Sequence, residues 1–123
     1  MLNTELQNAV GAFVAILQGS ETFEAFDTAR GSFQNDPVLR DIRKRFNARA
    51  TELQPKQSTG SLTQEEINEL RSFQKSLNAH PTTVEYIRER QRIIALLQQC
   101  NQALSAELGF DFASAAAPAS CCG

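Results

Sequence analysis

The longest uninterrupted helical pattern in the chain lies between His80 and Gly109, and it limits what the other segments can form. A His-Pro pair opens it, with Pro81 suited to the first helical position, and residues 82–108 contain neither Gly nor Pro. Gly109 stands where a helix places its left-handed stop residue. A helix of about seven turns needs neighbours along its length, so the pattern predicts an all-α fold.

Four further helical segments precede this one, each with apolar residues at three- and four-residue intervals (residues 2–17, 23–33, 39–53 and 67–77). Asp36-Pro37 predicts a capped helix start, and Thr63 with Glu66 fits a capping box. Residues 55–61, Pro-Lys-Gln-Ser-Thr-Gly-Ser, are expected to form the one internal loop. We therefore expect about five helices in an elongated antiparallel bundle with a long C-terminal helix.

The chain is expected to form one helical domain over residues 1–112, followed by a flexible Ala/Ser/Pro tail over residues 113–123. A net charge of -2 gives no bulk attraction to nucleic acid or anionic lipid. The longest apolar run, residues 9–17, is too short to cross a bilayer, and the N-terminus lacks the basic region of a signal peptide. We expect a cytoplasmic protein without membrane insertion.

The apolar arc of the last helix covers about half of its circumference, which is wider than the stripe of a helix packed on one neighbour. A second neighbour within the chain explains this width, and so does a subunit interface, for which we favour a homodimer. Arg90 lies inside the arc; we expect its stem to pack and its guanidinium to reach water or a carboxylate, rather than to anchor an acidic partner. The candidate interface residues are Tyr86, Ile87, Arg90, Ile94, Leu97 and Asn101.

Five of the 12 basic residues fall in a cluster between Arg40 and Arg49. Nucleic-acid binding needs such charges on one helix face, where they can follow a phosphate backbone. Projected on a helix they spread around its circumference, which is typical of a solvated surface. Direct nucleic-acid binding through Arg40–Arg49 therefore stays a disfavoured alternative.

We predict no catalytic residue and no small-molecule substrate. The only histidine, His80, precedes a proline at a helix start and is interpreted as a turn residue. No phosphate-binding loop, metalloprotease or nucleophile-elbow motif is present. We expect a protein that is not an enzyme.

The three cysteines differ in setting. Cys100 lies in the apolar stripe of the last helix and is expected to act as a small buried hydrophobe. Cys121 and Cys122 end the tail, where they could bind a metal or cluster, form mixed disulfides, or have no role. An iron–sulfur cluster usually takes four thiolates, so a cluster on these two would require a partner chain. No cofactor is required for the predicted fold.

Several short motifs follow one another in a characteristic order. They are Phe23–Phe26, Asp36-Pro37, the helix from Thr63 to Leu70, Asn78–Pro81, Val84–Ile87, Gln91, Leu96-Leu97, Cys100-Asn101 and Leu108–Phe112. In this order they resemble the YlbF/YmcA family of small bacterial regulators. The likeness extends over nearly the whole chain as far as Phe112.

The resemblance implies a non-enzymatic, oligomeric regulatory subunit that joins other small proteins, including a YaaT-type partner. Such complexes promote competence, sporulation and biofilm formation, act on messenger-RNA maturation through RNase Y, and carry cysteine-ligated iron–sulfur clusters. Cys121 and Cys122 would correspond to the family's C-terminal cysteines and supply thiolates to a shared [4Fe-4S] cluster. A plain helical scaffold of another pathway stays open as an alternative.

Overall fold

The computed structural model describes residues 1–118, which form helices and no strand. The predicted all-α class is therefore confirmed. None of the described helices is long and apolar enough to cross a membrane. The helices are α1 (Thr4–Gln18), α2 (Glu21–Asn35), α3 (Pro37–Thr59), α4 (Gln64–Ala79), α5 (Pro81–Leu108) and the short α6 (Phe112–Ala116).

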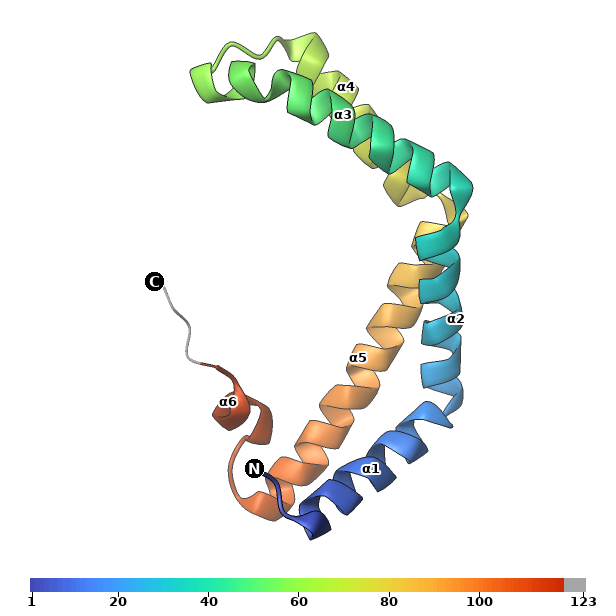
Figure 1. The fold of residues 1–123 in the computed structure, drawn as a ribbon, viewed down its shortest axis with the longest axis vertical. Coiled ribbons are helices and arrows are strands. Elements are labelled where there is room, and N and C mark those ends of the chain that lie inside the picture. Colours follow the sequence, from blue (N-terminus) through green and yellow to red (C-terminus); the bar gives the residue numbers. More distant parts are fainter. Residues whose placement is uncertain (119–123) are drawn as a thin grey trace.

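Two helix pairs are joined end to end and make up most of the molecule. α2 packs along α5, and α3 packs along α4. The chain bends where α2 leads into α3 and where α4 leads into α5, so that the α3–α4 arm points away from the α2–α5 pair (Figure 1). The molecule is elongated, as expected, but its helices do not surround one common core.

The bend is fixed by the cap of α3. The Oδ1 atom of Asp36 accepts hydrogen bonds from the backbone N–H groups of Val38, at 2.9 Å, and Leu39, at 3.1 Å. The other carboxylate oxygen accepts a hydrogen bond from the Thr82 hydroxyl at 3.1 Å, which ties the start of α3 to the start of α5. These bonds, with that from the Leu39 N–H the most important, lower the pKa of Asp36. The predicted Asp36-Pro37 helix start is confirmed.

The internal loop predicted for residues 55–61 is wrong for most of its length. α3 continues through Pro55 to Thr59, and only then does Gly60 end it in the left-handed conformation, with φ 71°. Pro55 lacks the N–H that would bond to the preceding turn. The helix persists because Leu53 is buried and Lys56 is held by α4, so tertiary contacts outweigh the proline.

The core is small. The buried apolar residues are Ala29, Leu39, Leu53 and Ile93, and Leu39 alone is completely buried. The chain exposes 9357 Å² of surface, whereas a compact monomer of its mass would expose about 6,600 Å². A fold that is two helices thick thus leaves much apolar surface uncovered.

Candidate protein-interaction surface

Three helices line an open apolar groove at the end of the molecule that holds the N-terminus. Its walls come from α1, from the C-terminal half of α5 and from α6, and its volume is about 680 Å³. We call residues 2–18 and 94–116 together the apolar end. The groove is lined by Leu6, Ala9, Val10, Phe13, Cys100, Ala103, Leu104, Glu107 and Phe112.

Exposed apolar side chains extend well beyond the groove. Twelve of the sixteen large exposed hydrophobic residues belong to the apolar end, and most are about half exposed. At roughly 90 Å² for each half-exposed side chain, the twelve together present on the order of 1,000 Å² of apolar surface. Five of the twelve line the groove. The twelve are Leu2, Leu6, Val10, Phe13, Val14, Ile16, Ile94, Leu97, Leu104, Leu108, Phe110 and Phe112.

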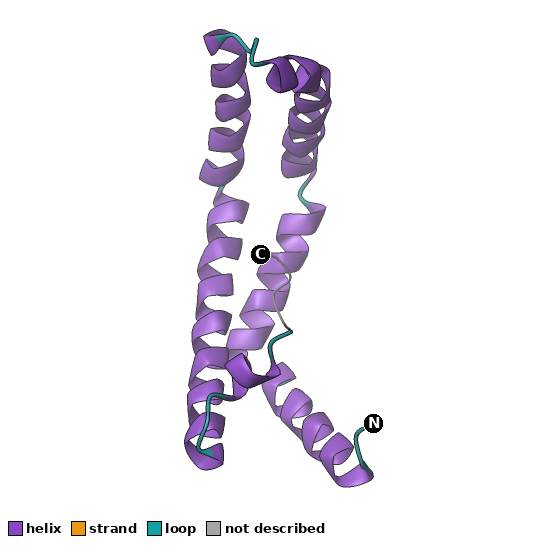
Figure 2. Ribbon diagram, turned by 90° about the vertical axis from the view of Figure 1, so that its left-hand side faces the viewer, coloured by secondary structure: helices purple, strands orange, loops and turns teal. Residues whose placement is uncertain are grey.

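α1 is the least supported of the long helices. Every α1 residue is exposed except Leu17, which is half-buried, and among the described helices only α2 lies close to α1. Figure 2 shows α1 running away from the α2–α5 pair. The junction is local: the Ser20 hydroxyl donates to the Leu17 carbonyl at 2.7 Å and accepts from the Phe23 N–H at 3.2 Å. Because an isolated helix of this length is marginal in water, α1 needs a covering surface.

A polar network holds α6 against the end of α5. The side-chain oxygen of Asn101 accepts a hydrogen bond from the Ala113 N–H at 2.9 Å, and its amide donates to Asp111 at 3.2 Å. The Ser105 hydroxyl accepts a bond from the Phe112 N–H at 2.9 Å. The Asn101 amide is the main reason why the pKa of Asp111 is lowered. The network places Phe112 in the groove wall, and it makes the start of the predicted flexible tail helical.

The predicted interface residues other than Asn101 lie at different places along α5. Tyr86 stacks within the chain, with its ring centroid 4.6 Å from that of Phe33 and 6.0 Å from that of Phe26. Arg90 and Ile87 are exposed in the N-terminal half of α5. Ile94 and Leu97 are exposed and belong to the apolar end, together with Asn101. Their part in a subunit interface stays a prediction.

Sequence reasoning placed Leu2, Leu6, Val10 and Phe13 on one helix face but did not select that face as an interaction surface. The distribution of Lys and Arg along the sequence could have identified this face as an interaction surface. Residues 1–29 and 93–123 contain no Lys or Arg, and all 12 basic residues lie between them. Charge depletion marks the centres of protein interfaces.

The basic cluster serves the fold. Arg40 Nε donates to the Gln34 carbonyl at 3.1 Å, and Arg43 donates to the Phe33 carbonyl at 2.9 Å with its guanidinium 4.4 Å from the Phe33 ring centroid. These arginines satisfy the last carbonyl groups of α2, which the helix itself leaves without partners. Arg45 pairs with Asp41 on its own helix.

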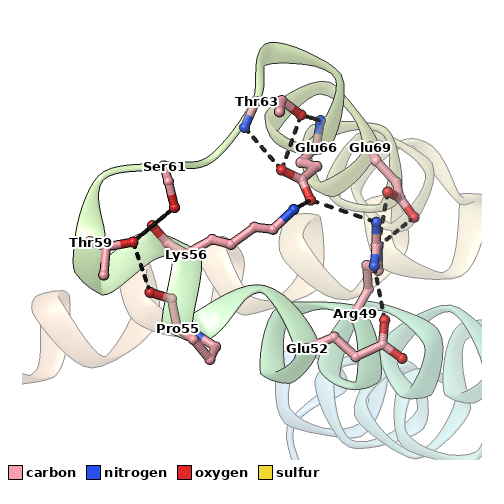
Figure 3. Close-up of polar contacts among 9 residues, drawn as sticks. All are labelled: Arg49, Glu52, Pro55, Lys56, Thr59, Ser61, Thr63, Glu66 and Glu69. Atoms are coloured by element: carbon pink, nitrogen blue, oxygen red, sulfur yellow. Dashed lines mark hydrogen bonds and ion pairs between the residues drawn. The ribbon is translucent and has the colours of Figure 1, made fainter.

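The remaining arginine of the cluster, Arg49, belongs to a polar latch between α3 and α4 (Figure 3). Arg49 Nε donates to both Glu69 carboxylate oxygens, at 3.0 and 3.1 Å, and Lys56 Nζ donates to Glu66 at 2.9 Å. The Glu66 carboxylate also accepts the Thr63 N–H at 3.0 Å, which confirms the predicted capping box. The Lys56 bond, followed by that from Thr63, lowers the pKa of Glu66 to about 2. These bonds hold α3 beside α4, so the latch stabilises the fold.

His80 acts as the predicted turn residue, because its Nδ1 accepts a hydrogen bond from the Thr82 N–H at 3.2 Å and so caps α5. Within residues 1–118, no three His, Cys, Asp or Glu side chains come close enough to form a metal site. Cys100 is half-buried in the groove wall. Cys121 and Cys122 lie outside the described residues.

Comparison with models of known protein families gives a match over most of the chain. A family model described as "Control of competence regulator ComK, YlbF/YmcA" matches residues 7–109, which is most of the chain. No curated protein and no solved structure matches significantly. The match confirms the resemblance drawn from the sequence motifs, and apart from Leu6 it includes the α1 and α5 residues that line the groove.

Proposed function

The chain belongs to the YlbF/YmcA family of regulators, and we propose that it acts as a non-enzymatic subunit that binds other protein chains through the apolar end. The observation that carries this proposal is the uncovered groove between α1, α5 and α6. Exposed apolar surface of this extent is typical of an interaction site.

We extend the proposal to the pathway that the family resemblance implies. The chain would join small regulatory proteins, including a YaaT-type partner, that promote competence, sporulation and biofilm formation through messenger-RNA maturation by RNase Y. The regulatory description of the family supports this assignment. The apolar end offers the surface that a multi-protein assembly needs.

A shared [4Fe-4S] cluster is the finer part of this proposal. Cys121 and Cys122 would supply two thiolates, and partner chains would supply the others, because a cluster usually takes four. Cys100 does not fit as a further ligand, since it lies among apolar side chains of the groove. The chain's own contribution would thus be two tail thiolates brought to the partner by docking of the apolar end.

The interaction surface can be tested by affinity capture from the native host without oxygen. An affinity tag placed in the α3–α4 turn after Gly60 keeps it away from α1 and from the tail. Leu104→Glu puts a charge into the groove and is expected to abolish partner capture. Gln98→Glu adds the same charge to an exposed position on the opposite face of α5 and is expected to leave capture intact. Equal capture by both variants would refute the proposed surface.

Binding of the iron–sulfur cluster can be tested separately from binding of partner proteins. If the tail thiolates are ligands, the captured complex is brown, and Cys121→Ser with Cys122→Ser removes the colour while partner proteins remain bound. If the protein is a plain scaffold, a colourless complex forms and truncation after Ala117 leaves capture unchanged. Truncation at this point preserves α6, which ends at Ala116.

A further inference from the structure

We infer that the groove of the apolar end is filled by α1 of a second copy of this chain, so that two copies exchange their first helices. The inference deepens the proposed function and rests on it, because it takes the apolar end as an interface and names its occupant. Each protomer would insert Leu6, Val10 and Phe13 between the α1 and α5 walls of its partner.

The relation of α1 to α5 is the first argument. Both helices line the same apolar groove, yet no Cα atom of α1 lies within 8 Å of one in α5 across the described helices. Packed helices have axes about 8–10 Å apart, which brings many Cα pairs within that distance. The two walls therefore do not pack on each other, and their facing apolar side chains have no partner helix within the described residues.

α1 is itself the helix that needs such a site. Its apolar residues Leu2, Leu6, Val10 and Phe13 share one face, and all four are exposed. A two-fold axis that seats α1 of one copy in the groove of the other also seats the second α1 in the first groove. One operation thus covers both α1 helices and both grooves.

The area fits a stable dimer. The exposed apolar side chains of this end present on the order of 1,000 Å², which is enough for the apolar part of a standard interface, in which each partner buries about 800 Å² of polar and apolar surface together. The twelve side chains extend from Leu2 to Phe112 and exceed what a small apolar ligand in the groove could cover. A helix from another chain is the occupant of suitable size.

Charge disfavours an acidic partner and leaves an apolar occupant for the groove. Glu107 is the only charged residue that lines the groove, and Glu5 is the only one in α1. An acidic peptide or an anionic membrane would need Lys or Arg, and neither occurs in residues 1–29 or 93–123. The exposed apolar face of α1 meets the requirement for an apolar occupant, and every copy of the chain carries one.

The first test measures the mass of the full-length protein by sedimentation equilibrium. The wild type is expected to have twice the 13.6 kDa of one chain. Val10→Glu buries a carboxylate in the interface and should weaken dimerisation at least about tenfold. Asn8→Glu, which adds the same charge to the opposite side of α1, should not. Circular dichroism checks that each variant retains its helices, and because α1 contacts only α2, the other helix pairs do not depend on it.

The second test uses disulfide formation with Cys100 in a Cys121→Ser, Cys122→Ser background. Leu6→Cys, Val10→Cys and Phe13→Cys are introduced singly and oxidised with diamide, with Asn8→Cys and the background alone as controls. A disulfide requires Cα atoms no more than about 6.8 Å apart. Because every α1–α5 Cα pair is more than 8 Å apart within one chain, a bond to Cys100 must join two chains. A covalent dimer is expected for at least one groove position and for neither control.

The outcomes separate this inference from the proposed function. A monomeric wild type without cross-linked dimers overturns the exchange of α1. If that monomer still captures a different protein and Leu104→Glu abolishes the capture, the apolar end remains an interaction surface and only its occupant was wrong. If it captures nothing, both proposals fail.

Discussion

Lys56 and Glu66 close the α3–α4 hairpin near its turn, with Nζ of the lysine 2.9 Å from Oε2 of the glutamate. The same carboxylate accepts the Thr63 N–H, so one side chain both caps α4 and holds α3 beside it. Glu66 is nearly buried, with 9% of its surface exposed. The contact explains why α3 runs past Pro55, since Lys56 directly follows the proline.

This pair makes the fold sensitive to acid. The pKa of Glu66 falls from 4.5 to about 2 in the folded protein. A lowered folded-state pKa stabilises the fold fully above the unfolded value, and that contribution is lost as the pH falls from about 4.5 towards 2. Glu66→Gln should therefore be less stable than the wild type at pH 7, and the difference should shrink at pH 3. Urea unfolding at fixed protein concentration measures both values.

Glu65→Gln is the matched control for this prediction, because Glu65 lies in the same first turn but is exposed. Its difference from the wild type should stay small at both pH values. A difference for Glu66→Gln that is independent of pH would contradict the role of the carboxylate charge.

Leu39 is the most buried side chain of a small core, with no exposed surface. Leu39→Ala is expected to lower the free energy of unfolding by about 2–5 kcal/mol, because it removes buried methyl groups and leaves a cavity beside the bend. Val38→Ala changes an adjacent residue that is 55% exposed and should change stability by less than about 1 kcal/mol. Chemical denaturation compares the two, and equal losses would show that the core lies elsewhere.

Asn101 is expected to control the order of α6. Asn101→Ala removes the acceptor of the Ala113 N–H and the donor to Asp111. Amide hydrogen exchange at Ala113 and Ser114 should become faster by about tenfold or more, since a lost bond of this kind is worth about 1–2 kcal/mol. Gln102→Ala alters an exposed neighbour and should leave this exchange unchanged. Unaltered exchange in Asn101→Ala would mean that the Ser105 bond and the packing of Phe112 hold α6 without Asn101.

Arg43 is expected to stabilise the protein rather than to bind nucleic acid. Arg43→Ala loses the bond to the Phe33 carbonyl and the contact with its ring, which should cost about 1–2 kcal/mol of unfolding free energy. Lys44→Ala, at an exposed neighbouring position, should cost less than about 0.5 kcal/mol. Thermal unfolding tests the stability. Salt-dependent binding of RNA that both substitutions weaken would contradict this role.

Local rules were sufficient for several of the helix ends, although not for the C-terminal end of α3. The Asp36 cap, the Thr63–Glu66 capping box and the stop at Gly109 each depend on residues within about one turn of one another, so the sequence alone predicts them. The family could be recognised for the same reason, because its motifs are short and ordered. The all-α class followed from periodicity along each helix.

Contacts between residues far apart in the sequence decided how α3 passes Pro55, how α2 is capped and whether α1 is covered. Pro55 lies inside a helix because Lys56 reaches Glu66 on α4, and Arg43 caps α2 from ten residues away. Whether the apolar face of α1 would be covered could not be read from periodicity, which shows that a face is apolar but not what lies against it. Within the described part of the chain, α1 lies near α2 alone. The reason is that two helix pairs joined end to end leave no third layer of helices that could cover α1.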